Sequence, residues 1–115
     1  MRILSQDGLI FNDIPYEKFV FGILRDRTTN KFFIVARKRM ISESGFKLND
    51  VVAEYSTESK ARKAMEMLRE AYVSHVMYKI MDQKQRALFL ANVSEDEQSY
   101  LYGVFQFQQD NEIEI

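Results

Sequence analysis

Apolar and aromatic residues gather first in two runs that a short polar segment separates. The runs cover residues 18–26 and 31–39 and are rich in β-branched and aromatic residues, with residues 27–30 between them. This spacing is typical of an antiparallel hairpin. In the first run both alternating sets of positions are apolar, which indicates a strand that is central in its sheet or covered on both faces.

Shorter apolar runs predict further strands on either side of this hairpin. Residues 1–4 and 9–11 are expected to form two short strands near the N-terminus, and residues 51–56 are another strand candidate. The only proline, Pro15, favours a loop or an edge strand, because it lacks the N–H that a central strand donates.

The longest periodic segment is a helix candidate over about residues 57–84. Apolar residues recur there at steps of three and four, which places them on one stripe of a helix. Ser56 or Thr57 can cap its start, and Lys84 and Arg86 lie near its expected end, where the helix dipole favours basic groups. The residues of the predicted stripe are Ala61, Ala64, Met65, Leu68, Tyr72, His75, Val76 and Lys79.

These elements predict an α+β fold in which a mainly antiparallel sheet packs against one long amphipathic helix. The expected order is strands over about residues 1–55, the long helix over about 57–84 and a terminal strand over about 101–107. With 115 residues, the chain is long enough to bury one core and too short for two independent ones. We therefore expect a single domain over residues 1–115.

Composition narrows the classes of function. Hydrophobic residues make up 46% and charged residues 29%, which is ordinary for a folded protein, and the net charge of -1 gives no global attraction to DNA or membranes. The absence of cysteine permits a reducing compartment. The N-terminal segment is unlike a signal peptide, and no run approaches the roughly 18 apolar residues of a membrane span. We expect a cytoplasmic protein with no membrane partner.

Charge is segregated along the chain although the net charge is small. Residues 25–47 contain seven Lys or Arg and two acidic residues, whereas residues 87–115 contain six acidic residues and no base. The basic segment can bind a phosphate backbone if its side chains converge on the hairpin, with Phe32 or Phe33 stacking on a base. Solvated strand ends that deter edge pairing explain the same residues equally well. The candidate nucleic-acid residues are Arg25, Arg27, Lys31, Arg37, Lys38 and Arg39.

Candidate catalytic chemistry is sparse. His75 is the only histidine, and a place on the apolar stripe of a helix is typical of a packed, hydrogen-bonded residue. One histidine and no cysteine leave no recognisable zinc site, and the chain has none of the glycine-rich phosphate-binding motifs. We therefore expect a non-catalytic protein, with no catalytic residue, no metal and no cofactor.

Methionine and tyrosine point to a protein partner. Both are common at adaptable protein interfaces, and four methionines fall in the predicted helix. A second apolar face on this helix can serve a protein partner or a second copy, so a homo-oligomer is expected. Acidic residues near the end of the chain can add to binding by imitating nucleic-acid charge. The candidate partner-binding residues are Met67, Tyr78, Asp110, Glu112 and Glu114.

Three segments of the chain resemble a family. They are "MRILSQDG" followed by "IPYE", then "YSTESKARKAMEMLREAY", and finally "FQFQQDNEIEI". The chain resembles short uncharacterised proteins encoded in prophages and other mobile elements of Gram-positive bacteria. Members typically have "YSTEEKA" and a proline after the "FxF" strand, where this chain has Ser59 and Gln108. The resemblance implies a small accessory protein made inside a bacterial host, and it supplies no activity and no binding residues.

Two hypotheses of function follow. The first is a small non-catalytic protein-interaction module of mobile-element origin, which binds or inhibits a host protein such as a defence nuclease. The second is a nucleic-acid-binding protein that acts through the basic hairpin and whose binding weakens steeply with salt.

Overall fold

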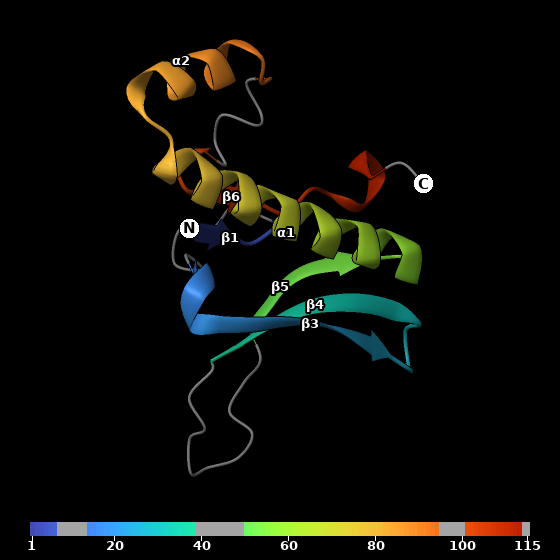
Figure 1. Ribbon diagram of the computed structural model, residues 1–115. Coiled ribbons are helices and arrows are strands. Elements are labelled where there is room, and N and C mark those ends of the chain that lie inside the picture. The colour runs from blue at the N-terminus through green and yellow to red at the C-terminus, as the bar shows by residue number, and fades with distance from the viewer. Residues whose placement is uncertain (7–13, 39–49, 95–100, 114–115) are drawn as a thin grey trace.

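The computed structural model describes residues 1–6, 14–38, 50–94 and 101–113 (Figure 1). The strand candidate at residues 9–11 lies outside them. The elements in chain order are β1 (Arg2–Leu4), β2 (Ile14–Pro15), η2 (Tyr16–Lys18), β3 (Phe19–Asp26), β4 (Lys31–Lys38), β5 (Asp50–Tyr55), α1 (Glu58–Ile80), α2 (Gln83–Ala91), β6 (Val104–Gln106) and η3 (Asp110–Glu112).

The described strands form two three-stranded sheets, so the fold is mixed α and β but is not built on the single sheet that we expected. One sheet has the order β2-β1-β6, with β1 antiparallel to β2 and parallel to β6. The other has the order β3-β4-β5 and is antiparallel throughout. The parallel pair was not predicted, because parallel strands need a long crossover and no local pattern shows that β6 returns beside β1. Pro15 lies in the edge strand β2, as its missing N–H requires.

The hairpin of β3 and β4 confirms the hairpin that the two apolar runs predicted. Its register runs from Phe19 opposite Lys38 to Asp26 opposite Lys31. The carboxylate of Asp26 accepts hydrogen bonds from the Thr28 N–H at 2.9 Å and the Thr29 hydroxyl at 2.9 Å, which holds the turn. These hydrogen bonds lower the pKa of Asp26, and the bond from the Thr28 N–H is the largest cause.

The predicted central or covered position of β3 is wrong. Among the described strands, β3 pairs with β4 alone, and β4 is the central strand. Val20 and Leu24 of β3 are 53% and 52% exposed, whereas Ile34 of β4 is fully buried. An apolar pattern on both faces of a strand does not distinguish a covered strand from an edge strand that leaves one face open.

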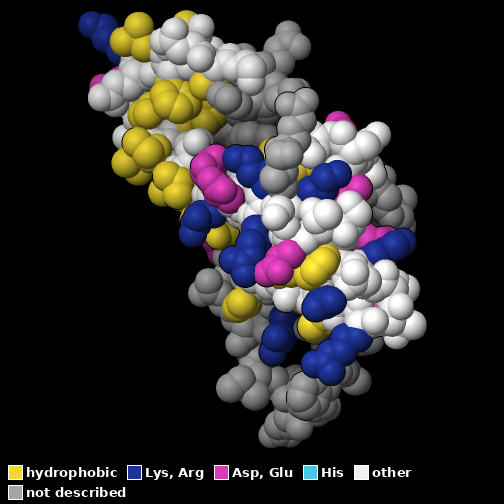
Figure 2. Space-filling model, turned by 90° about the vertical axis from the view of Figure 1, so that its right-hand side faces the viewer, with side chains coloured by type: hydrophobic (Ala, Val, Ile, Leu, Met, Phe, Trp, Pro, Cys, Tyr) yellow, Lys and Arg dark blue, Asp and Glu magenta, His cyan; other side chains and the backbone are white. Residues whose placement is uncertain are grey.

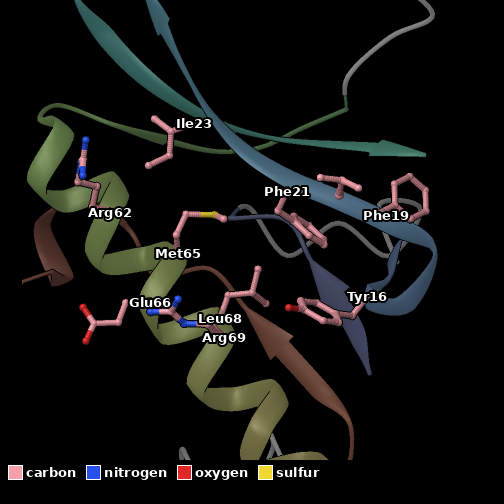
Figure 3. A pocket seen from close by; sticks show the side chains of 10 residues that line it. Tyr16, Phe19, Phe21, Ile23, Arg62, Met65, Glu66, Leu68 and Arg69 are labelled. Carbon is pink, nitrogen blue, oxygen red and sulfur yellow. The ribbon is translucent and has the colours of Figure 1, made fainter. Parts of the chain in front are cut away.

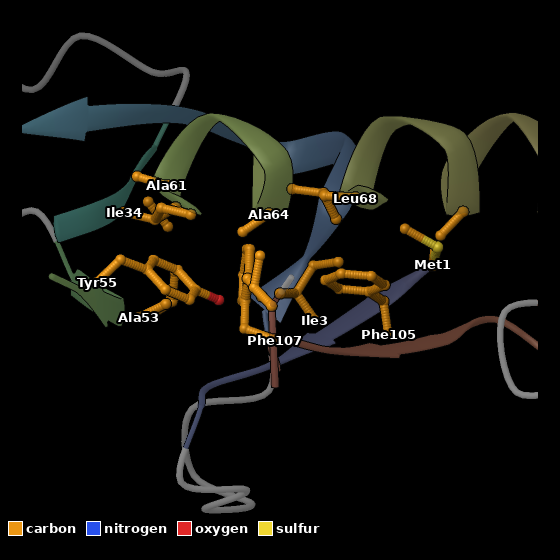
Figure 4. Close-up of a cluster of buried hydrophobic side chains, with 14 residues drawn as sticks. Met1, Ile3, Ile34, Ala53, Tyr55, Ala61, Ala64, Leu68, Phe105 and Phe107 are labelled. Carbon is orange, nitrogen blue, oxygen red and sulfur yellow. The ribbon is translucent and has the colours of Figure 1, made fainter. Parts of the chain in front are cut away.

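The inner face of α1 shares a core with both sheets. Thr57 caps the helix by accepting a hydrogen bond from the Lys60 N–H at 3.2 Å. The buried apolar residues of α1 lie in one cluster with strand residues, as Figure 4 shows for Ile34, Tyr55 and Phe105. The buried residues of the helix are Ala61, Ala64, Leu68, Ala71 and His75.

The predicted stripe of the long helix is correct in its first half and wrong near its end. Ala71 is buried although it was not in the prediction, and Val76 and Lys79 are exposed although they were. The buried side of α1 is the side of Ala71 and His75. Steps of three and four in the sequence locate the centre of such a stripe only to within one residue.

The helix predicted over about 57–84 is two helices. Met81 has extended backbone angles, and Asp82 caps α2 in a reciprocal capping box with Gln85. The guanidinium of Arg86 donates to the carbonyl oxygens of Tyr78 at 3.1 Å and Lys79 at 2.9 Å. These bonds cap carbonyls of the last turn of α1, and the Tyr78 oxygen also accepts from the Met81 N–H at 3.3 Å. In Figure 1, α2 projects on the far side of α1 from the β3-β4-β5 sheet.

Gln6 joins the two sheets through its side chain. Its backbone N–H donates to Val52 at 2.7 Å, and its amide both donates to the Glu54 carbonyl at 3.2 Å and accepts from the Glu54 N–H at 2.9 Å. The same amide donates to the Gln108 carbonyl at 2.9 Å. The side chain therefore bonds the β5 backbone as a neighbouring peptide group would, and connects it to the segment after β6.

Among the described residues, neither helix has the length and apolar composition that a membrane span needs.

Candidate protein-interaction surface

The described hairpin does not bring the candidate nucleic-acid residues together. Arg25 and Arg37 lie toward opposite ends of the hairpin, since Arg25 pairs with Phe32, five residues or about 17 Å along β4 from Arg37. Arg25 also lies on the opposite face of the sheet from Lys31 and Arg37, because side chains alternate along a strand. Arg27 lies exposed in the turn.

Two of these basic residues have partners within the hairpin sheet. Arg25 donates to the Asn30 side chain at 2.7 and 3.2 Å, and its guanidinium lies 5.9 Å from the Phe32 ring centroid. Lys31 forms an ion pair with Glu54 at 2.9 Å, and the hydrogen bond to that carboxylate raises the pKa of Lys31. The side chain of Lys38, like Arg39, lies outside what the structure describes. Nucleic-acid binding by this hairpin stays a prediction.

His75 is a packed residue of the core. It is 5% exposed, and its Nδ1 lies 3.0 Å from the Leu101 carbonyl oxygen. A carbonyl oxygen can only accept, so Nδ1 carries the proton of this bond. Gly103 lies against the ring, where an added Cβ would come within 3.1 Å of His75 Cε1. In the described part of the chain, no three His, Cys, Asp or Glu residues are grouped so that they could hold a metal ion.

The candidate acidic residues near the end of the chain bond to the chain itself. The Asp110 carboxylate accepts from the Ser56 N–H at 2.8 Å and the Ser56 hydroxyl at 3.0 Å, and it lies 3.4 Å from Lys60 Nζ. The bond from the Ser56 N–H is the main cause that lowers the pKa of Asp110. Glu112 accepts from the Gln109 N–H at 2.8 Å. Glu114 lies outside the described residues.

The other two candidate partner residues are partly buried. Met67 packs against the core cluster. The Tyr78 ring lies edge to face with Tyr102 at 6.3 Å, and the guanidinium of Arg86 lies 5.0 Å from its centroid. Both side chains therefore make their main described contacts inside the molecule, and neither is the centre of an open apolar surface.

Sequence reasoning expected a second apolar face on α1 but assigned Met67 and Tyr78 to partner binding and missed the residues that are exposed there. These residues, which we call the outer stripe, are Val73, Val76, Met77 and Ile80, and all of them are exposed, Ile80 to 79%. At about 100° per residue, this stripe lies opposite the buried stripe of the same helix. The signal was present in the sequence as steps of three and four, but it lies among the residues used for the predicted inner stripe.

The apolar surface includes α2. None of the residues of α2 is buried, and Leu88 is 69% exposed. Figure 2 shows hydrophobic side chains gathered at the upper end of the molecule, at the height of α2 and of the last turns of α1, whereas charged side chains are spread below. Apolar groups gathered on one face indicate a protein contact more than scattered ones do.

Comparison of the chain with family models, with curated proteins and with solved structures gives no match. Its function is therefore inferred from its own geometry.

Proposed function

We propose that this chain is a small non-catalytic protein-interaction module that self-associates through the outer stripe and α2. The observation that carries this proposal is that α1 buries apolar residues on one side and exposes the outer stripe on the opposite side of its C-terminal half. The resemblance to mobile-element proteins adds a bacterial host as the setting, in which a host protein can take the place of the second copy.

The structure of α2 supports this proposal. Helices of nine residues are marginal in water, and most helices in proteins gain their stability from packing an apolar face. Here the capping box of Asp82 and Gln85 and the bonds of Arg86 hold the start of α2. No residue of α2 is buried. A partner that covers Leu88 would add packing to that of Phe89 and Leu90, which are only partly buried.

The expected strength of this contact is moderate. Full burial of one large apolar side chain contributes about 1.5–3 kcal/mol, and the side chains of the outer stripe and Leu88 are already partly covered. The summed burial free energy of these side chains is of the same order as the roughly 4–15 kcal/mol that association costs in lost translational and rotational freedom. We therefore expect a reversible complex whose population depends on protein concentration.

Sedimentation velocity over a range of protein concentrations tests the proposal. We expect the wild type to shift toward dimer as concentration rises, and Ile80→Glu to remain monomeric because a carboxylate would be buried against an apolar partner. Lys63→Gln is the matched control, since it also changes the net charge by one unit at an exposed position of α1 outside the outer stripe. A wild type that stays monomeric throughout, or an Ile80→Glu variant that dimerises like it, would refute self-association through this surface.

A further inference from the structure

A groove of about 580 Å³ runs between β3 and the first half of α1. It is separate from the outer stripe and contains none of its residues. Figure 3 shows Phe21 and Ile23 on the strand side of the groove, with Met65 and Leu68 across it on the helix. Its volume falls within the range of about 300–1,000 Å³ that is typical of ligand sites.

Aromatic stacking closes one end of the groove. The Tyr16 ring stacks on Phe21 with centroids 5.7 Å apart and on Tyr72 with centroids 4.1 Å apart. Tyr16 belongs to η2, directly before β3, and Tyr72 belongs to α1, so the stack joins both walls. The groove is therefore held open by packed side chains, with an apolar floor available for a ligand.

One wall of the groove is an open sheet edge. Within the described part of the chain, β3 has no strand partner other than β4. Alternate residues of an antiparallel strand turn their N–H and C=O groups away from the partner strand. Charged residues and proline usually protect a sheet edge from pairing. Residues 19–24 contain neither. At Gly22 an added Cβ would meet nothing within 4 Å, so another backbone can approach closely there.

The helix side of the groove carries a rim of mixed charge. Arg62, Glu66 and Arg69 line it. Arg62 is already paired with Glu58 at 2.7 Å, whereas Arg69 has no hydrogen bond or ion pair with another described residue. The rim thus leaves one guanidinium for a carboxylate of a ligand, and guanidinium–carboxylate pairs are among the stronger polar contacts.

We propose that this groove binds an extended acidic segment of a protein partner, which pairs with the free edge of β3 and places a carboxylate against Arg69. Alternate side chains of such a segment point to opposite sides. The set that faces α1 must therefore hold both the apolar residues that enter the groove between Phe21 and Met65 and the acidic residue that reaches Arg69. Main-chain hydrogen bonds to β3 supply affinity, and the apolar floor and Arg69 supply specificity, as in other cases of strand addition to a sheet edge.

A second copy of β3 fits this chemistry less well. The only carboxylate of that strand belongs to Asp26, which holds its own turn through Thr28 and Thr29. A strand that presents apolar residues and one acidic residue on the same face matches both the floor of the groove and Arg69.

Fluorescence anisotropy with a labelled peptide tests the proposal. The probe is a peptide with the same number of residues as β3, which has 8. One of its two alternating sets of positions holds valines and one glutamate, the other set holds threonines, and both ends are capped so that no terminal carboxylate is present. We expect it to bind the wild-type chain. Arg69→Glu should raise the dissociation constant by about tenfold or more. The matched control is Lys63→Glu, which makes the same charge change on exposed α1 outside the groove and should leave binding unchanged.

Two further peptides separate strand addition from simple charge attraction. A peptide methylated at alternate backbone nitrogens loses the donors that face β3 and should not bind. A peptide with lysine in place of glutamate should prefer the Arg69→Glu variant. No binding by any acidic peptide, or binding that neither Arg69→Glu nor methylation changes, would overturn the proposal.

The result is distinguishable from that of the self-association experiment. Ile80→Glu lies outside the groove, so it should abolish dimers without changing peptide affinity. If dimers persist in Ile80→Glu and no acidic peptide binds, a second copy occupies the β3 edge, and the acidic partner is wrong.

Discussion

Both faces of α1 carry apolar residues, but the other described residues cover only one of them. On the inner face, Ala64 and Leu68 are 2% exposed beneath the strands. On the outer face, Met77 is 49% exposed and Ile80 79% exposed. Apolar content alone therefore does not locate the core. The inner face is the one against which the two sheets, joined by Gln6, and the segment after β6 pack.

The largest expected difference between the faces concerns stability. Leu68→Ala should lower the free energy of unfolding by about 2–5 kcal/mol, because it removes buried methyl groups and leaves a cavity. Met77→Ala, a truncation of similar size on the outer face, should change it by about 0.5 kcal/mol or less. Urea denaturation followed by circular dichroism measures both, at a protein concentration low enough to avoid self-association. Equal losses would mean that the outer face is also covered in the monomer.

Two glycines extend the comparison to the strands. Gly103 lies on the packed side with φ +91°, where an added Cβ would press on His75. Gly103→Ala should therefore destabilise the chain by about 1–3 kcal/mol through backbone strain and crowding. Gly22 lies in β3 with open space around it. Gly22→Ala should stabilise the chain by about 0.5–1 kcal/mol, because alanine loses less conformational freedom on folding.

Thermal unfolding of the two glycine variants beside the wild type checks both signs. A destabilising Gly22→Ala would show that the edge of β3 is covered in solution. A covered edge would not be free to pair with another strand beside the groove. A neutral Gly103→Ala would show that His75 can move away at no cost.

The parts of the fold that the sequence predicted are those set by neighbouring residues. The hairpin of β3 and β4, the strand β5 and the cap at Thr57 each depend on residues within a short stretch of the chain. The break after Ile80 was also readable, because Asp82 followed by Gln85 has the spacing of a capping box. It was missed because the apolar period continues through it.

The parts that were missed depend on distant residues. The contact of Asp110 with Ser56 joins residues 54 apart in the chain, and the parallel register of β1 with β6 joins segments about a hundred residues apart. No local pattern specifies such partners. For the same reason Asp110 was predicted to face a partner, whereas it accepts from Ser56. The bond of Glu112 to the Gln109 N–H is local and was overlooked. The groove also needs two elements to meet, so neither β3 nor α1 reveals it alone.

The smallest expected effect concerns the tie between the end of the chain and the start of α1. Asp110→Asn should lower the free energy of unfolding near pH 7 by about 1 kcal/mol or less, since the side chain is 38% exposed and solvent screens the charge. The pKa of Asp110 is lowered in the folded chain, chiefly by the Ser56 N–H. The carboxylate therefore contributes stability above its ordinary pKa of 3.8, and this contribution is lost as the pH falls through the lowered folded value.

The pH dependence and a double-mutant cycle test this tie together. The difference in stability between wild type and Asp110→Asn should be constant from neutral pH to about pH 5 and should shrink in more acidic solution. Ser56→Ala removes the hydroxyl donor but keeps the N–H, so the effect of Asp110→Asn should be smaller in that background without vanishing. Additive effects of the two substitutions would mean that the Ser56 hydroxyl contributes nothing to the tie. A difference that does not vary with pH would mean that the Asp110 carboxylate stabilises the chain through its shape and not through its charge.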